Sequence, residues 1–245
     1  MVDIHCHILP FTDDGAADTG AALTMARMAY DSGVTTIVAT PHCNLPYVGE
    51  KNYVSEELKN RFISLRDGIR DAGIPLTILP GAEVMCTDEL PELLRSRRVL
   101  TLAGTRYLLV EFLFDESLGY IEEMLAQVSE AGLVPVIAHP ERYDAVQRSP
   151  LAVVEWFGRG YIIQLNKGSI LGRLGSRAER ASAWILSRGL AHVVASDAHS
   201  PEMRTPHMSE ILRFLEDNCS PEYADVLLRR NPRRIIENRQ VLQAL

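Results

Sequence analysis

The sequence predicts an α/β fold in which parallel strands alternate with helices. Short apolar runs rich in β-branched residues recur along the chain, as in strands buried on both faces of a parallel sheet. Segments with helical spacing lie between these runs, and several end in a glycine that suits a helix C-terminus. The alternation repeats about seven times, which predicts right-handed βα units arranged either as a barrel or as a doubly wound sheet.

The expected elements follow one another in a regular order. Strands are expected at residues 2–8, 34–42, 76–84, 107–112, 134–140, 161–166 and 192–199. The clearest helices are expected at 20–33, 53–73, 118–132 and 176–189, which end in Gly33, Gly73, Gly132 and Gly189. After Glu222 the pattern predicts a helix, a break at Asn231 and Pro232, and a second helix. The arginines of this segment are expected on a solvated face or in a salt-bridged cap.

Length and composition describe one ordinary globular unit. The chain has 245 residues, of which 47% are hydrophobic and 23% charged, so it can bury a substantial core. α/β barrels of this length commonly form one domain, and we expect a single domain over residues 1–245. The formal net charge of -7 argues against nucleic-acid binding, which needs a basic surface to neutralise phosphates.

The sequence also predicts a cytoplasmic protein without membrane insertion. The first expected strand begins at residue 2, which leaves no room for a signal peptide, and no apolar run reaches membrane-spanning length. The cysteines show no CxxC pairing and are expected to be free thiols: Cys6, Cys43, Cys86 and Cys219. We expect the first three to be small apolar residues beside the site.

Residue types that bind metals recur where the expected strands end. They are His5, His7, Asp14, His42, Glu83, Glu111, His139, Asn166, Asp197 and His199. Parallel α/β barrels build their active sites at this end of the strands. Each residue alone has a structural explanation, and Asp14 could simply cap a helix that starts near Ala16. Glu111, however, lies in a buried apolar run, where a carboxylate needs a cation to neutralise it.

The first strand carries two of these histidines two positions apart. Side chains two residues apart on a strand share a face, so His5 and His7 are expected to point one way and Ile4 and Cys6 the other. Leaving Asn166 aside, five histidines and four carboxylates exceed the needs of one tetrahedral zinc. They suit two or three divalent ions of Mn, Fe or Zn, the kind of cluster that hydrolyses phosphate esters.

Two arginines in the loops after the fifth and seventh strands support a phosphate substrate. Arg142 and Arg204 are expected at the mouth of the site, where a planar guanidinium grips phosphate oxygens well. Phe11 and Tyr47 are candidates for an aromatic rim. The two other histidines of the chain, His192 and His207, are expected to lie at the surface or at a helix start.

Together these motifs resemble a known family. The segments DIHCHILPFTDDGA, ATPH, GAEV, VEF, AHPERY and VVASDAH, followed by Arg204, are similar to the polymerase and histidinol phosphatase (PHP) superfamily. They resemble most closely its bacterial manganese-dependent protein-tyrosine phosphatases of the capsule and exopolysaccharide type. The resemblance covers essentially the whole chain and implies a distorted (β/α)7 TIM-like barrel, the PHP fold.

The resemblance also implies a set of ligands for three divalent ions, with Mn²⁺ as the leading choice and Fe or Zn as alternatives. The first ion would be bound by His5, His7, Glu83 and Asp197, the second by Glu83, Glu111 and His139, and the third by Asp14, His42 and His199. Arg142 and Arg204 match the family's substrate-phosphate arginines. Asp3, Asp13 and Asn166 are expected to support the ligands or to form turns rather than to bind metal.

The activity that the resemblance implies is that of a phosphoric monoester hydrolase acting on phosphotyrosine. Its partner would be the phosphotyrosine-bearing tail of a bacterial tyrosine autokinase that regulates capsular or exopolysaccharide synthesis. The expected mechanism is in-line attack by a metal-bridging hydroxide, without a phosphocysteine intermediate. A cysteine phosphatase needs an arginine six residues after its cysteine, and none of the four cysteines has one.

Three alternatives use the same metal site. The first is a small-molecule PHP phosphatase such as histidinol-phosphatase, which a deep, closed pocket would distinguish from a protein phosphatase with an open mouth. The second is a PHP nuclease, which the acidic net charge disfavours. The third is a metal-bound regulatory or scaffolding module without activity, which the complete set of ligands and arginines disfavours.

Overall fold

The fold is known from a computed structural model that describes residues 1–46 and 51–243. In these ranges the strands are β1 (Val2–Cys6), β2 (Thr36–Ala39), β3 (His42–Cys43), β4 (Thr77–Pro80), β5 (Glu83–Met85), β6 (Tyr107–Glu111), β7 (Val134–Ala138), β8 (Ile162–Asn166) and β9 (Val193–Ala195). The α-helices are α1 (Thr19–Asp31), α2 (Glu56–Asp71), α3 (Leu90–Arg95), α4 (Leu118–Glu130), α5 (Asp144–Arg148), α6 (Leu151–Gly158), α7 (Lys167–Ile170), α8 (Ser176–Leu186), α9 (Ser209–Asn218), α10 (Pro221–Asp225) and α11 (Asn231–Ile236). Short helical turns are η1 (Leu102–Gly104), η2 (Pro140–Arg142) and η3 (Val226–Arg230).

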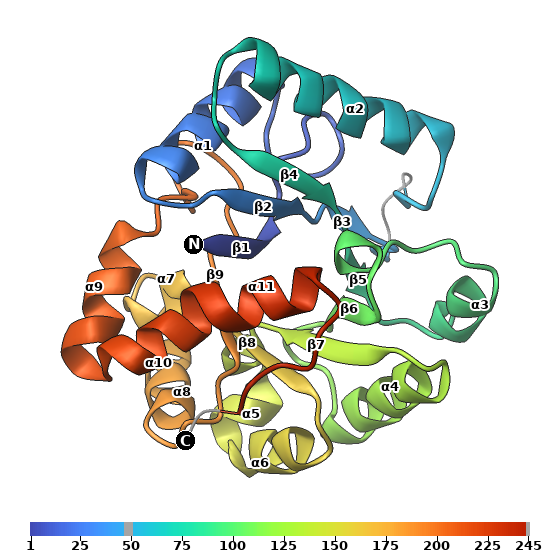
Figure 1. The fold of residues 1–245 in the computed structure, drawn as a ribbon. Coiled ribbons are helices and arrows are strands. Elements are labelled where there is room, and N and C mark those ends of the chain that lie inside the picture. The colour runs from blue at the N-terminus through green and yellow to red at the C-terminus, as the bar shows by residue number, and fades with distance from the viewer. Residues whose placement is uncertain (47–50, 244–245) are drawn as a thin grey trace.

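All strand pairs are parallel, which confirms the predicted α/β class. One sheet has the order β1-β2-β4 and the other β3-β5-β6-β7-β8-β9, with the long helices placed outside the strands (Figure 1). An isolated parallel bridge between Cys6 and Ala198 joins the first strand to the segment after the last. In the described residues the strands thus form two sheets linked in a barrel-like arrangement rather than one continuous hydrogen-bonded ring.

Two of the predicted strands are each split into two. The run 34–42 forms β2 and β3, which are interrupted at Thr40 and Pro41, and the run 76–84 forms β4 and β5, which are interrupted at Gly81 and Ala82. Proline cannot donate to a strand ladder, and a Cβ on Gly81 would lie 2.7 Å from Cγ1 of Val38. The interruptions carry β3 and β5 into the second sheet, where His42 pairs directly with Glu83.

The inner face of the strands changes from apolar to polar toward the C-terminal ends. Because side chains alternate along a strand, Leu109 and Glu111 of β6 share this face, as do Ala195 and Asp197 at β9. The apolar members belong to an inner core cluster that also contains Ile4. A second, larger cluster fills the space between strands and helices. Alternation therefore places the polar groups in one layer at the C-terminal ends of the strands, next to the apolar inner core cluster.

Helix α11 covers the opposite end of the strands. Figure 1 shows α11 lying across the strands. Ile235 packs in the inner core cluster with Val2 and Tyr107, which lie at the beginnings of β1 and β6. The predicted break at Asn231 and Pro232 is wrong, because Asn231 keeps helical angles of φ -69° and ψ -45°. Pro232 follows the π-helical turn η3, a wider turn of the kind that accommodates such interruptions inside a helix.

The helices begin and end largely as the sequence predicts. Asp18, Ser55 and Ser117 cap α1, α2 and α4 by accepting from a backbone N–H three residues later. The four glycines expected at helix ends have φ between 62° and 93°, a range that favours glycine: Gly33, Gly73, Gly132 and Gly189. Among the residues that the structure describes, no helix combines the length and apolarity that crossing a membrane requires.

Two predictions about local environment need correction. Ile4 and Cys6 do not share a face, because the pairing register of β1 with β2 shifts between Asp3 and Cys6, so Ile4 joins the inner cluster and Cys6 the outer one. His192 is buried rather than exposed. Its Nδ1 accepts from the backbone N–H of Ile163, and burial lowers its pKa to about 4.

Candidate metal centre

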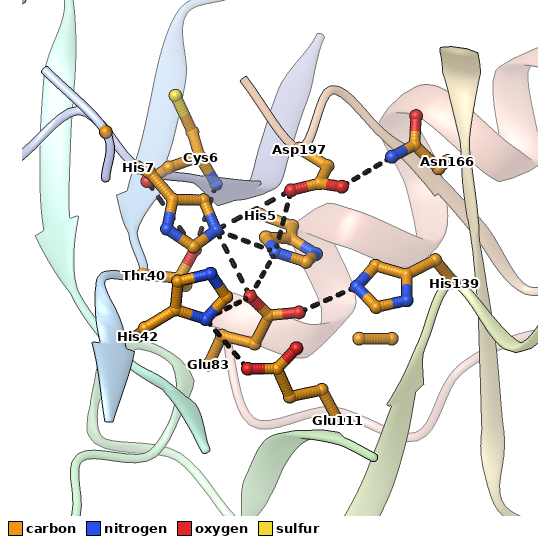
Figure 2. Close-up of polar contacts among 12 residues, drawn as sticks. His5, Cys6, His7, Thr40, His42, Glu83, Glu111, His139, Asn166 and Asp197 are labelled. Carbon is orange, nitrogen blue, oxygen red and sulfur yellow. Dashed lines mark hydrogen bonds and ion pairs between the residues drawn. The ribbon is translucent and has the colours of Figure 1, made fainter. Parts of the chain in front are cut away.

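The nine predicted ligands converge on one end of the strands. Figure 2 shows this convergence for His5, His7, His42, Glu83, Glu111, His139 and Asp197. Glu83 lies at the centre of the group and is fully buried. Its Oε2 is 3.2 Å from Nε2 of both His5 and His7 and 3.1 Å from Nδ1 of His42. Its Oε1 accepts from Nε2 of His139 at 2.9 Å. One carboxylate thus contacts histidines from β1, β3 and the end of β7.

The histidines decide the protonation state of this carboxylate. Burial alone would raise the pKa of Glu83, but the positive fields of His5 and His42 and the hydrogen bond from His139 hold it well below its usual range. Glu111 has the opposite balance, since burial and the nearby charge of Glu83 raise its pKa. The site therefore brings together several buried carboxylates whose negative charge is unfavourable in a low-dielectric core unless cations neutralise it.

The donor atoms form three groups, within each of which all atoms lie within 4.8 Å of one another. These groups are His5, His7, Glu83 and Asp197; His42, Glu83 and Glu111; and His7, Asp14, His42 and His199. The first is the first implied ligand set. The second has His42 where the resemblance implies His139, which is instead hydrogen-bonded to the other oxygen of Glu83. The third adds His7 to the implied set.

The spacing of the first group fits a divalent ion. Nε2 of His5 lies 3.2 Å from Nε2 of His7 and 3.4 Å from Oδ1 of Asp197, and the other measured separations are 3.2–3.6 Å. Ligand atoms about 2.1 Å from a shared ion lie about 3.0–3.5 Å from one another. Oε2 of Glu83 and Oδ1 of Asp197 are also buried without a hydrogen-bond partner. A cation would satisfy these two oxygens and both nitrogens together.

Neighbouring side chains fix the orientation of the donors. Nδ1 of His5 donates to Oε1 of Gln164 at 2.8 Å, and Nδ1 of His7 donates to Oδ2 of Asp13 at 2.7 Å. Asn166 donates to Oδ2 of Asp197 and leaves Oδ1 facing the histidines. Hydrogen bonds of this kind select the tautomer that turns the other ring nitrogen toward a metal.

Sequence reasoning found only some of these supporting residues. Asp13 and Asn166 were expected in this role, and Asp3 has a related one, because its Oδ1 accepts from the backbone N–H of His5 and of Ser196. Gln164 was missed. The available signal was its position two residues before Asn166 on β8, which places it on the same inner face.

The two arginines lie beside Asp197 at the mouth of the site. Nη2 of Arg204 donates to Oδ2 of Asp197, and Nη1 of Arg142 lies 3.7 Å from the same oxygen. Three residues here have left-handed backbones, with φ of 35° at His139, 49° at Asp197 and 28° at Arg204. Such strain persists where surrounding structure enforces it and is concentrated at functional sites.

The donors and arginines border a cavity of about 260 Å³. It is lined by Asp14, His42, Glu83, Met85, Glu111, Phe112, Leu113, Phe114, His139, Arg142, Asp197 and Arg204. Asp14 is at its rim with a side chain that is 66% exposed, and Asp18, not Asp14, caps the first helix. Phe11 is exposed but does not line this cavity, and Tyr47 lies outside the described residues. Leu113 and Phe114 were not anticipated from the sequence.

Gly15 allows the loop after β1 to pass close to His7. A Cβ at this position would lie 2.1 Å from the carbonyl oxygen of His7. Gly15→Ala should therefore displace His7, weaken metal binding at least about tenfold and lower the free energy of unfolding by about 1–3 kcal/mol. Metal titration and thermal unfolding would measure both effects. The matched control is Gly119→Ala in α4, where a Cβ has open space; wild-type affinity in Gly15→Ala would contradict the proposed loop constraint.

Metal binding should release protons near neutral pH. Burial alone would lower the pKa of His42, but Glu83 and Glu111 outweigh it and raise the pKa to about 9. Because this folded value exceeds the ordinary 6.5, the charged ring stabilises the metal-free fold below pH 6.5 and loses that effect as the pH rises through 9. A metal ion must displace the proton.

Manganese added to chelator-stripped protein at pH 7.5 in weak buffer should therefore acidify the solution, and His42→Gln should release fewer protons than the wild type. A pH-indicator dye would report the release. His207→Gln, which changes an exposed histidine, is the control. Metal uptake without proton release, or equal release from His42→Gln, would show that the metal does not displace a proton from His42.

Comparison with known proteins agrees with this geometry. The sequence profile of the family described as "Capsular polysaccharide synthesis, CpsB/CapC" matches residues 1–237. Tyrosine-protein phosphatase YwqE of Bacillus subtilis is 36% identical over 99% of this chain and 94% of its own length. Tyrosine-protein phosphatase CpsB of Streptococcus pneumoniae is 32% identical over 96% of this chain and 98% of its own length.

A solved structure extends the similarity to the whole fold. It comes from work on YwqE from Bacillus subtilis and CpsB from Streptococcus pneumoniae, described as metal-dependent tyrosine phosphatases. It superposes with a TM-score of 0.91 at 34% identity and covers 100% of this chain and 99% of that chain. The resemblance seen in the sequence is confirmed, and the chain belongs to the CpsB/CapC family.

Proposed function

We propose that this protein is a metal-dependent protein-tyrosine phosphatase that acts in capsular or exopolysaccharide synthesis. The observation that carries the proposal is the set of three donor groups, in which Glu83, His7 and His42 each belong to two groups. Arg142 and Arg204 line the same cavity as Glu83 and His42. The names of the relatives YwqE and CpsB support tyrosine phosphatase activity. The family description supports the connection with capsule synthesis.

The proposed cofactor is a cluster of three divalent ions, with Mn²⁺ preferred and Fe or Zn as alternatives. Imidazole and carboxylate donors suit all three metals. His5, His7, Glu83 and Asp197 would hold one ion, Glu83 and Glu111 with His42 or His139 a second, and Asp14, His42 and His199 a third. Bound ions would supply Lewis-acid activation of water and stabilisation of charge on the phosphoryl oxygens.

The chain's own residues would bind and orient the phosphoryl group. Arg142 and Arg204 each present a guanidinium beside Asp197. A phosphate would compete with that carboxylate for their N–H groups and offer them bidentate contacts. The leaving group is a phenol with a pKa of about 10, so its departure needs little help from a general acid.

The cysteines support hydrolysis without a phosphocysteine. Cys6, Cys43 and Cys86 are buried. Burial raises the pKa of each thiol, to about 12 for Cys43, whereas a nucleophilic cysteine needs a lowered pKa. Cys219 is exposed, but its pKa is also raised.

The shape of the cavity favours a protein substrate over a small metabolite. Pockets for small molecules are usually about 300–1,000 Å³ and bury most of the ligand. This cavity of about 260 Å³ lies below that range, and its rim includes the exposed side chains of Asp14 and Phe114. The rest of the substrate would lie outside, as in a phosphorylated protein segment.

The proposed partner is the phosphotyrosine-bearing tail of a bacterial tyrosine kinase. We place this reaction in the cytoplasm and treat residues 1–245 as one catalytic domain. The shape of such a tail supports this choice. A tail supplies an extended chain, which an open cavity accepts more readily than a folded surface. Nucleic acid is not proposed, because the formal net charge of -7 opposes a polyanion.

The decisive experiment compares a phosphotyrosyl peptide with histidinol phosphate. Chelator-stripped protein would be assayed alone and after addition of Mn²⁺, Mg²⁺ or Zn²⁺. We expect activity on the peptide to return with Mn²⁺ and to exceed that on histidinol phosphate. Preference for histidinol phosphate would assign the metal site to a metabolic phosphatase. Activity that persists after the metal is removed by chelation would refute the metal-dependent mechanism.

Replacing either arginine by lysine should keep the charge but lose the planar fork. We expect Arg142→Lys and Arg204→Lys to lower kcat/KM for the phosphotyrosyl peptide by about 10- to 150-fold, the effect of losing charge-assisted hydrogen bonds of about 1.5–3 kcal/mol. Steady-state kinetics with saturating Mn²⁺ measures this effect. Arg70→Lys, on an exposed part of α2, is the control. Unchanged kinetics in both variants would show that the arginines do not bind the phosphate.

A further inference from the structure

Two large apolar side chains are exposed at the mouth of the cavity. Leu113 and Phe114 follow β6 in the loop before α4, and their exposed fractions are 46% and 45%. Both line the cavity together with Glu111, Arg142 and Arg204. Exposed apolar surface beside convergent polar groups is typical of a ligand-binding site, because only a bound ligand removes it from water.

Phe114 is held in a defined position. Its backbone carbonyl accepts from the N–H of Asp144 at 2.7 Å, and its ring packs 36° from the plane of Tyr143 with centroids 6.5 Å apart. Tyr143 is itself buried and donates to the carbonyl of Ala138. The loop is therefore anchored to the residues that follow η2 and, through Tyr143, to the end of β7, next to His139 and Arg142.

The ring of Phe114 lies next to both phosphate-binding and metal-type residues. The guanidinium carbon of Arg142 is 4.2 Å from the ring centroid, and the ring of His139 is 6.1 Å away in an edge-on arrangement. A phosphoryl group held by Arg142 thus places its ester substituent within reach of Phe114 and Leu113. An aromatic substituent would gain both apolar burial and ring–ring contact there.

We propose that Phe114 and Leu113 form a leaving-group subsite that selects aryl phosphate monoesters over alkyl ones. The proposal rests on the proposed phosphatase function and adds the residues that recognise the ring. The competing explanation is that Phe114 only stacks on Arg142 and positions its guanidinium. The two explanations differ, because a positioning role affects every phosphate equally, whereas a subsite affects only substrates that carry a ring.

Binding of non-hydrolysable phosphonates separates these roles without relying on turnover. Titration calorimetry with metal-loaded protein would compare phenylphosphonate with methylphosphonate. We expect Phe114→Ala to raise the Kd of phenylphosphonate about tenfold and that of methylphosphonate less than about twofold. Leu113→Ala should produce the same pattern more weakly. Leu151→Ala, at an exposed leucine outside the cavity, is the matched control.

Kinetics provides the second readout. Phenyl phosphate would be compared with hexafluoroisopropyl phosphate, whose alkyl leaving group has an acidity close to that of phenol, so the difference reports ring recognition rather than bond strength. Phe114→Ala should lower kcat/KM for phenyl phosphate about tenfold and leave the alkyl ester within about twofold. Phe114→Leu keeps an apolar side chain at this position, and its kcat/KM for phenyl phosphate should fall between those of the wild type and Phe114→Ala.

Equal losses for aryl and alkyl ligands would overturn the proposal and assign Phe114 to positioning Arg142. Unchanged phenylphosphonate affinity in Phe114→Ala would overturn it as well. If Phe114→Ala weakens phenylphosphonate binding selectively but the wild type hydrolyses neither ester, the proposed function is refuted while ring recognition by Phe114 is supported. Circular dichroism would show whether each variant is folded, and Leu113→Ala keeps the test available if Phe114→Ala is not.

Discussion

The buried carboxylate of Glu83 is the constraint on which the site depends. Four histidines at the ends of three strands contact it, and the positive fields of His5 and His42 with the hydrogen bond from His139 keep it ionised in a core that would otherwise favour the neutral acid. Each oxygen of Glu83 faces nitrogen atoms rather than water. An arrangement with this much mutually dependent charge is costly without cations, which explains why the same donors are grouped at distances suited to divalent ions.

The fold provides this arrangement through two simple features. Alternation along β6, β8 and β9 turns their inner faces from apolar to polar at the C-terminal ends, while α11 covers the other end. The interruptions at Pro41 and Gly81 carry β3 and β5 into the second sheet and set His42 opposite Glu83. Arg142 and Phe114 then complete one side of the cavity from the loops after β7 and β6.

Much of this could be predicted because the chemistry is local in sequence. Ligand types at strand ends, such as His139 and Asp197, identify the site without knowledge of packing. The split strands, the burial of His192 and the contact of Gln164 with His5 could not be predicted, because they depend on register and on neighbours distant in sequence. Phe114 was missed for the same reason, since an apolar residue in a loop has no distinguishing local pattern until its exposure and its contact with Arg142 are known.

The most direct test of the metal-centre account is anomalous X-ray diffraction from crystals of the Mn²⁺-loaded protein. The account predicts anomalous peaks at the manganese edge within the donor groups, with one peak enclosed by His5, His7, Glu83 and Asp197. Peaks confined to other parts of the molecule, or none at these donors in protein that is active, would contradict it.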